Sequence, residues 1–457
     1  MNVNRRQFIK KAGLAAIGTV LAPYILPSGR LFAQTATPLA QHVVLVMFAG
    51  GVRHQEAIGR RYLYDSQYLI NPIEENASEG NIMPNMLTGE APTIKVVYGC
   101  DPPAGAGPPG SIPIPPVLQQ PLQESSTLFS EMRSGSAGHY NGLVGLVSGN
   151  YAASQGLRQK PVNPTIFEYL RRYRGEAAGK VWFVGNGIGN STPLLNYSRH
   201  SDFGPQYGAN FFAPGVTFGS KGIEFFADAK NYHPEEDLGP VYEMKSFLDK
   251  SFLTTGGLLP DLGNTPEEKY SIKQFMDYIF NGGATGTLSG LGCGMSGDSI
   301  TVAYACEVLK WFKPTLLAVN MGNVDTCHSN FTNYLRSMHR ADFAVGYLWN
   351  YIQTQIPDMA GNTIMIVVPE CGRNEQPNAI KDFNDWRAYD HSDANATRVF
   401  GMMTGPNVPT NLTIGNEANP IGNAGQVALT IAEILGIKQP VADAGMVING
   451  QSLFDLI

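Results

Sequence analysis

Two apolar segments of the chain each run into side chains that can bind a metal ion. The first leads into VNMGNVDTCHSN, which contains Asp325, Cys327 and His328. The second leads into NTIMIVVPECGRN, which contains Glu370 and Cys371. Zinc takes carboxylate, imidazole and thiolate ligands, whereas magnesium and calcium prefer oxygen. These residue types therefore predict a divalent-metal site, with zinc as the expected ion.

The two clusters can meet only if the segments that precede them are neighbouring strands. Both segments are continuous apolar runs, which is typical of strands buried on both faces of a parallel sheet. In open α/β sheets ligands bind at the carboxyl ends of such strands. Five strands are predicted in all, over residues 41–49, 180–185, 315–322, 363–369 and 398–405.

Helical patterns separate these strands. Residues 330–356 carry an apolar stripe with helical spacing, and further helices are predicted over 164–174, 298–313 and 426–436. This alternation predicts an α/β fold: a mostly parallel central sheet with helices on both faces. Residues 186–297 are rich in Gly, Asn, Tyr and Phe and are interpreted as an irregular cap inserted into a single domain that spans 34–457.

The N-terminal segment 1–33 has the features of an export signal. Asn4 to Lys10 resembles a twin-arginine signal, and a short apolar run and small residues near Ala33 follow it. We therefore expect a partnership with the twin-arginine translocase during export and a periplasmic or otherwise exported location. The net charge of −6 offers no basic patch for nucleic acid. The odd number of cysteines leaves at least one thiol unpaired.

Several motifs occur together in an order that is characteristic of one superfamily. Asp325 and His328 form D-x-x-H, the following helix reads Y-L-R-x-x-x-R-A-D-x-A-V-G, and the next strand leads into P-x-x-G-R. His391 and Ser392 come later, and the C-terminal run from TIAEILGI to GQSLF is similar to the ending of sulfatases. The chain thus resembles the alkaline phosphatase superfamily, nearest to its sulfatase-like, twin-arginine-exported members.

This resemblance implies an enzyme that hydrolyses phosphate or sulfate esters with two divalent metals and a Ser, Thr or modified Cys nucleophile. It assigns Asp325, His328 and His391 to one metal site. Glu370 and Cys371 stand where the family has the Asp-His pair of the second site. Arg373 could bind an oxyanion of the substrate, or it could be a surface arginine paired with Asp382 or Asp385.

The sequence also departs from the family pattern. Ala49 or Gly50 stands where the first strand normally ends in Asp, and Cys371 replaces a histidine, so the second site is either remodelled or lost. His54 and Glu56 could replace the missing carboxylate, although their interpretation as solvated loop residues is favoured. No cysteine lies in a C-x-P-x-R or C-x-A-x-R context, which argues against a formylglycine sulfatase.

The nucleophile is sought at a helix N-terminus, where backbone N–H groups and the helix dipole hold an anion. The segment SGSAGHYN fits this place, so Ser136 or Ser134 could attack, and His139 could bind metal or the ester oxygens. The alternative is a Gly/Ser turn that merely caps the helix.

The second cluster also carries two geometric expectations. Adjacent strand residues point in opposite directions, so a bend at Glu370–Gly372 is predicted to bring at least one side chain towards Asp325 and His328. Cys327 and Cys371 could approach each other, which would give either a thiolate-rich zinc site or a disulfide.

Two functions remain open from the sequence. The first is an exported metal-dependent hydrolase of phosphate or sulfate esters that acts on a small-molecule ester. The second is a non-catalytic alkaline phosphatase-like protein that binds or assembles a component of the cell envelope.

Overall fold

The computed structural model describes residues 36–62, 78–92, 98–107, 109–152, 160–185, 195–213 and 262–457. The expected export signal lies outside these residues, as do parts of the expected cap. Among the helices that are described, none is long and apolar enough to cross a membrane.

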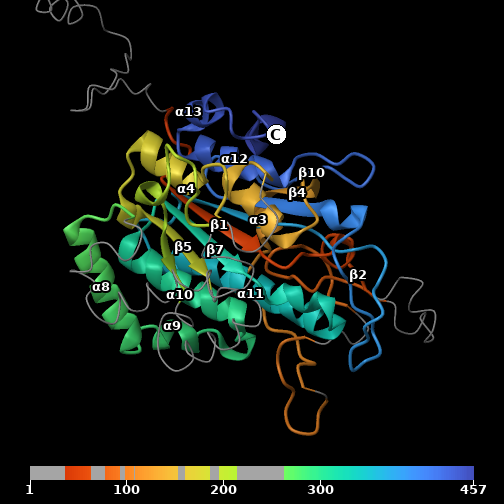
Figure 1. Cartoon of the computed structure of the whole chain (residues 1–457). Helices are drawn as coiled ribbons and strands as arrows, with labels where there is room; N and C mark the ends of the chain where they lie inside the picture. Colours follow the sequence, from red (N-terminus) through yellow and green to blue (C-terminus); the bar gives the residue numbers. More distant parts are fainter. Residues whose placement is uncertain are drawn as a thin grey trace, which may run out of the picture.

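The centre of the molecule is one eight-stranded sheet (Figure 1). Its strands follow the order β10-β4-β9-β8-β1-β7-β5-β6, and in this sheet β9 alone runs against the others. The predicted mostly parallel sheet is therefore confirmed. The strands are β1 (His42–Phe48), β4 (Ser126–Arg133), β5 (Val181–Gly185), β6 (Asn210–Phe212), β7 (Leu316–Met321), β8 (Thr363–Pro369), β9 (Arg398–Thr404) and β10 (Leu412–Ile414).

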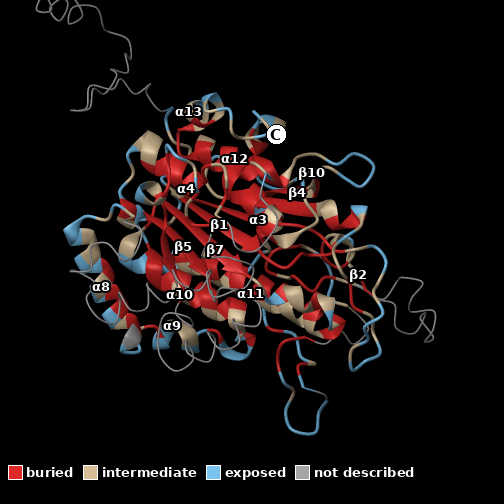
Figure 2. Cartoon of the chain, in the orientation of Figure 1, coloured by how far each residue is buried: buried red, intermediate tan, exposed pale blue. Residues whose placement is uncertain are grey.

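Helices cover both faces of this sheet (Figure 1). Because strand side chains alternate between faces, Val44 and Val46 pack into one apolar core while Val43 and Leu45 pack into the other. The central strands are buried along their length (Figure 2). One face carries α3 (His139–Ser148), α4 (Ile166–Tyr169), α12 (Val427–Ile434) and α13 (Lys438–Asp443); the other carries α8 (Pro266–Phe280), α9 (Thr285–Ser289), α10 (Gly297–Phe312) and α11 (Phe331–Gln355).

The caps of the long helices explain where they begin. The Asn330 side chain accepts a hydrogen bond from the Asn333 N–H and starts α11. Ser296 caps α10 through the Ser299 N–H, one turn before the helix pattern becomes apolar. Asp298, in the first turn, is buried and accepts from the N–H groups of Gly322 and Asn323. This carboxylate therefore fixes the loop that follows β7.

One edge of the sheet collects the loops of five strands. Strands β1, β7 and β8 end in register, with Phe48 opposite both Met321 and Pro369. Strand β4 runs parallel to β8, so the segment after Arg133 leaves at the same edge. Because β9 is antiparallel, the residues just before Arg398 also lie there. The topology therefore places residues 49–56, 134–139, 322–328, 370–375 and 389–397 around one crevice.

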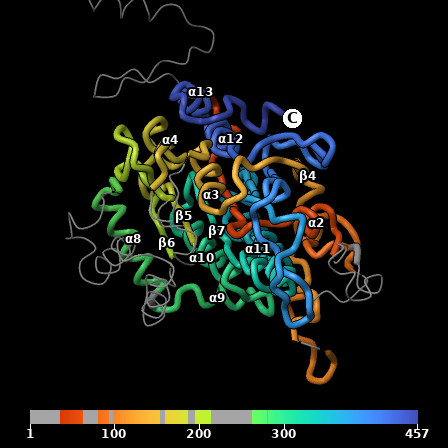
Figure 3. Tube along the Cα trace, turned by 45° about the vertical axis from the view of Figure 1, so that its right-hand side comes forward, coloured from red at the N-terminus to blue at the C-terminus, as the bar shows by residue number. Residues whose placement is uncertain are grey.

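The segment expected to be a cap contributes to both the sheet and its cover. Within 186–297, β6 pairs with β5 at the edge of the sheet, and α8 and α9 pack beside α10 (Figure 3). Residues 186–194 and 214–261 of this segment lie outside the described part of the chain.

A disulfide joins Cys100 to Cys293, and Cys306, Cys327 and Cys371 are buried free thiols. The proposed disulfide between Cys327 and Cys371 is therefore wrong. The side chain of Cys327 packs into the apolar core beside α11, whereas Cys371 Sγ contacts His139. An internal disulfide is typical of proteins from oxidising compartments.

This pairing predicts a thiol count that depends on location. Protein recovered from an oxidising compartment and denatured without reductant should titrate three thiols, and reduction should raise the count to five. A variant with Arg5→Lys and Arg6→Lys is expected to stay in the cytoplasm and should titrate five thiols directly. Five free thiols in the exported protein would contradict the disulfide.

Candidate metal centre

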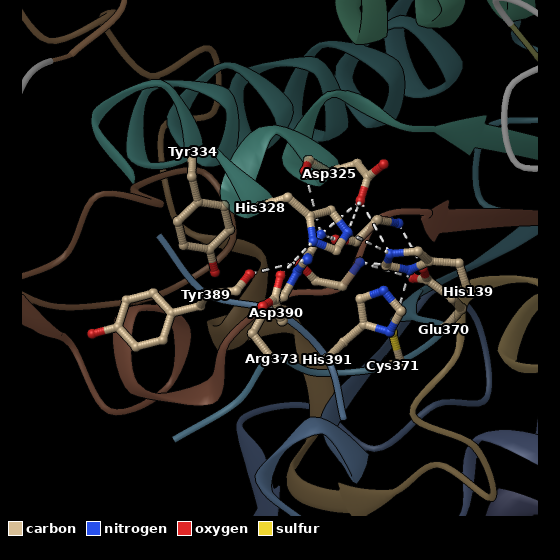
Figure 4. A network of polar contacts seen from close by, with 12 residues as sticks. His139, Asp325, His328, Tyr334, Glu370, Cys371, Arg373, Tyr389, Asp390 and His391 are labelled. Carbon is tan, nitrogen blue, oxygen red and sulfur yellow. Dashed lines mark hydrogen bonds and ion pairs between the residues drawn. The ribbon is translucent and has the colours of Figure 1, made fainter. Parts of the chain in front are cut away.

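Three imidazoles and one carboxylate converge at the crevice (Figure 4). His139 is the first residue of α3, His328 ends the short helix η9 (Asn323–His328), and His391 lies in the loop before β9. Their nearest nitrogens lie within 4.8 Å of one another. Asp325 Oδ1 is 3.0 Å from His139 Nε2 and 3.1 Å from His328 Nε2. The structure thus brings together Asp325, His328 and His391, and it places His139, the other histidine that the sequence offers as a possible metal ligand, in the same cluster.

Each imidazole is oriented through its Nδ1 atom. His139 Nδ1 lies 2.7 Å from Glu370 Oε1, and His328 Nδ1 lies 3.1 Å from Asp390 Oδ1. His391 Nδ1 donates to the Ala137 carbonyl over 2.8 Å. When Nδ1 carries the proton, Nε2 presents a lone pair, and carboxylates or carbonyls commonly fix metal-binding histidines in this way. All three rings are therefore prepared to bind one cation through Nε2.

The separations suit a zinc-sized ion. Nε2 of His139 and Nε2 of His328 are 3.4 Å apart. In a tetrahedral zinc site with bonds of about 2.0–2.1 Å, neighbouring ligand atoms lie roughly 3.3–3.4 Å from each other. The distances to Asp325 Oδ1 are close to this value. The distances among His139, His328 and Asp325 are therefore compatible with a bound divalent ion, and His391 lies within 4.8 Å of the other two imidazoles.

The electrostatics of the cluster favour a positive charge at its centre. Burial alone lowers the pKa of His139, but hydrogen bonds to Asp325, Cys371 and Glu370 raise it to about 12. Burial raises the pKa of Asp325, yet hydrogen bonds from His139 and His328 hold that pKa well below its usual value. Burial lowers the pKa of His391 to about 4, so this ring is neutral at physiological pH. Either a proton on His139 or a bound metal cation would supply the positive charge that the surrounding carboxylates favour.

Glu370 and Cys371 both face His139, although they are adjacent in sequence. Cys371 Sγ is 3.5 Å from His139 Nδ1, and the three side chains form a second possible metal-binding group. The chain bends at Glu370 as it leaves β8, and a side chain at Gly372 would collide with the Arg398 carbonyl. The predicted bend is therefore present and turns both side chains into the crevice.

The Glu370 carboxylate already accepts hydrogen bonds from backbone amides. Its Oε1 atom accepts from Gly50 N over 2.5 Å and Gly51 N over 3.1 Å, in addition to His139. A Cβ at Gly50, whose φ is +126°, would lie 2.5 Å from Asp325 N, so no side chain fits there. Burial and the nearby Glu370 raise the pKa of the Cys371 thiol to about 11. This geometry suits Glu370 as the group that orients His139 better than as a ligand of a second metal.

Arg373 fixes the position of Asp325 and of the surrounding loops. Its guanidinium is fully buried and donates to the carbonyls of Gly50 and Tyr389 and, over 2.7 Å, to Asp325 Oδ1. It is therefore not a surface arginine paired with Asp382 or Asp385. The same contacts turn its donors towards protein acceptors, so they point to a positioning role for Asp325.

The two candidate serines are bound to the backbone. The Ser134 hydroxyl is buried and donates to the Glu370 carbonyl over 2.8 Å. The Ser136 hydroxyl accepts from Gly138 N over 3.0 Å. Within the described residues neither hydroxyl contacts an imidazole or carboxylate that could take its proton.

Two further expectations concern neighbouring residues. Glu56 is buried against Arg53, and His54 contacts Glu131 and the Ser130 carbonyl, so neither is a solvated loop residue and neither reaches the crevice. Sequence reasoning did not identify Asp390 as a functional residue. Its position directly before His391 could have indicated such a role, because carboxylates often form hydrogen bonds to metal-binding histidines.

No protein-family model and no curated protein matches the chain. Among solved structures, it is similar to an alkaline phosphatase superfamily protein from Vibrio parahaemolyticus (10% identity, TM-score 0.39, covering 95% of this chain and 76% of that one). It is also similar to the lipoteichoic acid synthase LtaP from Listeria monocytogenes (10%, 0.40, 92% and 76%) and to the alkaline phosphatase of the Antarctic bacterium TAB5 (11%, 0.42, 88% and 99%). At identities of 10–11% and TM-scores of 0.39–0.42 these similarities carry no functional argument, and the functional conclusion rests on the site geometry.

Replacing Arg373 tests its positioning role. Arg373→Gln should lower the free energy of unfolding by about 3 kcal/mol, because the Asp325 carboxylate and two buried carbonyls lose the donor that a fully buried guanidinium provides. The matched exposed change Lys381→Gln should cost less than about 0.5 kcal/mol. Urea denaturation of both variants measures the difference. Equal stability of the two variants would show that Arg373 does not hold the site.

Proposed function

We propose that this protein is an exported hydrolase of phosphate or sulfate esters that uses one divalent ion, expected to be zinc. The observation that carries the proposal is the convergence of three imidazoles, each fixed through Nδ1, on Asp325 at the carboxyl edge of a parallel sheet. The side chains of Asp325 and His328 are each 35% exposed. Solvent and a small substrate can therefore reach these two side chains.

The residues around the ion have separable roles. His139, His328 and His391 would hold it through Nε2, and Asp325 would supply a charged oxygen. Glu370 and Asp390 keep the Nδ1 protons in place, and Arg373 keeps Asp325 ionised. When bound, such an ion polarises an ester oxygen and lowers the pKa of a coordinated water.

The N-terminus of α3 supports an anionic substrate. His139 is the first residue of this ten-residue helix, so the positive end of the helix dipole lies beside the ligand atoms. This field favours an ester with negatively charged oxygens, such as a phosphate or sulfate ester, over a neutral one. The acidic net charge of the chain argues against nucleic acid as the substrate.

We favour water as the attacking group. Ser134 is committed to the Glu370 carbonyl, and Ser136 bonds to Gly138, without a neighbouring base. Ser136 remains the side-chain alternative because it is only partly buried and precedes α3. Loss of activity in Ser136→Ala with unchanged metal content would favour the serine.

A non-catalytic role is the second candidate, and one observation favours it. The backbone amides of Gly50 and Gly51 donate hydrogen bonds to the Glu370 carboxylate, which would otherwise be a ligand of a second metal. Three histidines and Asp325 could also close a tetrahedral site, and closed four-ligand zinc sites are usually structural. The protein would then bind or assemble an envelope component.

Export is supported by two independent features. The N-terminal segment resembles a twin-arginine signal, and the Cys100–Cys293 disulfide suits an oxidising compartment. The translocase would then be a transient partner, and the periplasm or another exported location the place of action.

Metal content and hydrolysis test the proposal together. Exported protein should contain one equivalent of zinc by elemental analysis and should hydrolyse p-nitrophenyl phosphate or sulfate. His328→Ala and His391→Ala should lose both metal and activity, because each removes a ligand nitrogen. Asp390→Asn should weaken metal binding about 10–100-fold by releasing the His328 ring.

His200→Ala is the matched control, because His200 lies outside the crevice and contacts the Asp202 backbone. It should retain metal and activity. One equivalent of metal without turnover of either ester would favour the non-catalytic role. Absence of metal in protein matured in its own compartment would contradict the hydrolase and would favour a non-catalytic protein without a bound ion.

A further inference from the structure

A second polar groove, away from the metal centre, is lined by residues of α8, α9, α10 and α11. It has a volume of about 430 Å³, which falls in the range of small-ligand sites. We call it the tyrosine groove and define it by Tyr278, Thr287, Glu307, Tyr347, Asn350 and Tyr351.

The floor of the tyrosine groove is a buried carboxylate. Glu307 on α10 is only 1% exposed. Its carboxylate accepts from the hydroxyls of Thr287 and, over 3.2 Å, Tyr278. Lys310 Nζ lies 3.7 Å from the same carboxylate. The charge of Glu307 is therefore compensated, and its carboxylate fixes the polar side chains that line the groove.

Aromatic rings form the wall of the groove. Tyr347 and Tyr351 are one turn apart on α11, with ring centroids 6.3 Å apart and planes inclined by 30°. Tyr347 is fixed because its hydroxyl donates to the Thr287 carbonyl over 3.0 Å. Asn350 lies between them in sequence and also lines the groove, and its side-chain amide has no hydrogen-bond partner in the described part of the chain. The wall thus combines two apolar ring faces with one free amide.

We propose that the tyrosine groove binds a saccharide. Sugar rings offer C–H faces that pack on aromatic rings, and their hydroxyls both donate to carboxylates and accept from amide and ammonium groups. Tyr347 and Tyr351 supply the rings, Asn350 the amide and Lys310 the ammonium group. The chemistry of the lining matches a neutral polyhydroxylated ligand on each count.

A cationic ligand fits the groove less well. Tyrosines around a carboxylate can bind ammonium groups through cation–π attraction. Here, however, Lys310 already places an ammonium beside Glu307 and 5.6 Å from the centroid of the Tyr278 ring. That charge would repel a second cation, whereas a sugar hydroxyl could accept a hydrogen bond from it.

The groove is independent of the proposed hydrolase site. Phe331 and Tyr347 both lie on α11, and a rise of about 1.5 Å per residue separates them by roughly 24 Å along the helix. A single sugar unit bound in the groove cannot reach the metal ligands, but an extended glycan chain could span both sites.

Binding measurements on the full mature protein test this assignment. Isothermal titration with cellohexaose, chitohexaose and maltohexaose should detect at least one complex. Tyr347→Ala and Tyr351→Ala should each weaken that complex about tenfold by removing a stacking face. Asn350→Ala should weaken it as well, without disturbing the aromatic wall. Tyr270→Ala, an exposed tyrosine of α8 outside the groove, should bind as the parent does.

Three results would overturn the proposal. The first is that none of the three oligosaccharides binds at millimolar concentration. The second is that binding survives unchanged in Tyr347→Ala, Tyr351→Ala and Asn350→Ala, each shown to be folded by its unfolding midpoint. The third is that tetramethylammonium binds the groove and the sugars do not. Because metal content and ester hydrolysis are measured separately, failure here leaves the proposed hydrolase function intact.

Discussion

The carboxylate of Glu370 is the constraint on which the crevice depends. It is buried, and a buried carboxylate is stable only when hydrogen bonds replace its hydration. The amides of Gly50 and Gly51 and the His139 ring supply these bonds, while the Glu370 carbonyl accepts from Ser134. One residue thus ties together the loops that follow β1, β4 and β8. His139 stands in the crevice because Glu370 holds it there.

The architecture follows closely from the sequence because apolar periodicity reports burial directly. The strand after Gln41, the two strands before Asp325 and Glu370, and the long helix after Asn330 are all present in the structure. What the sequence could not provide is the order and direction of the strands at the far edge. The antiparallel course of β9 depends on long-range pairing with β4 and β8, which local residue patterns do not encode. The sequence did not predict strand β6, because β6 lies in a segment whose apolar periodicity is weak.

The site was predictable in its residue types and less so in their roles. Asp325, His328 and His391 converge as their positions at strand ends indicate. The sequence pattern could not show that Arg373 is buried, because its environment is built from residues about 50 and 320 positions away. Nor could it show that backbone amides of Gly50 and Gly51 replace a metal-binding carboxylate. Main-chain groups carry no residue identity, so their use as hydrogen-bond donors is not apparent from composition.

X-ray absorption at the zinc edge of the exported protein tests the central claim most directly. A site built from His139, His328, His391 and Asp325 predicts nitrogen and oxygen neighbours at about 2.0–2.1 Å with imidazole scattering beyond them. Glu370 and Cys371 should remain outside the coordination sphere, so no sulfur neighbour is expected. A sulfur shell at about 2.3 Å would make Cys371 a ligand and would contradict the role assigned here to the Glu370–His139 pair.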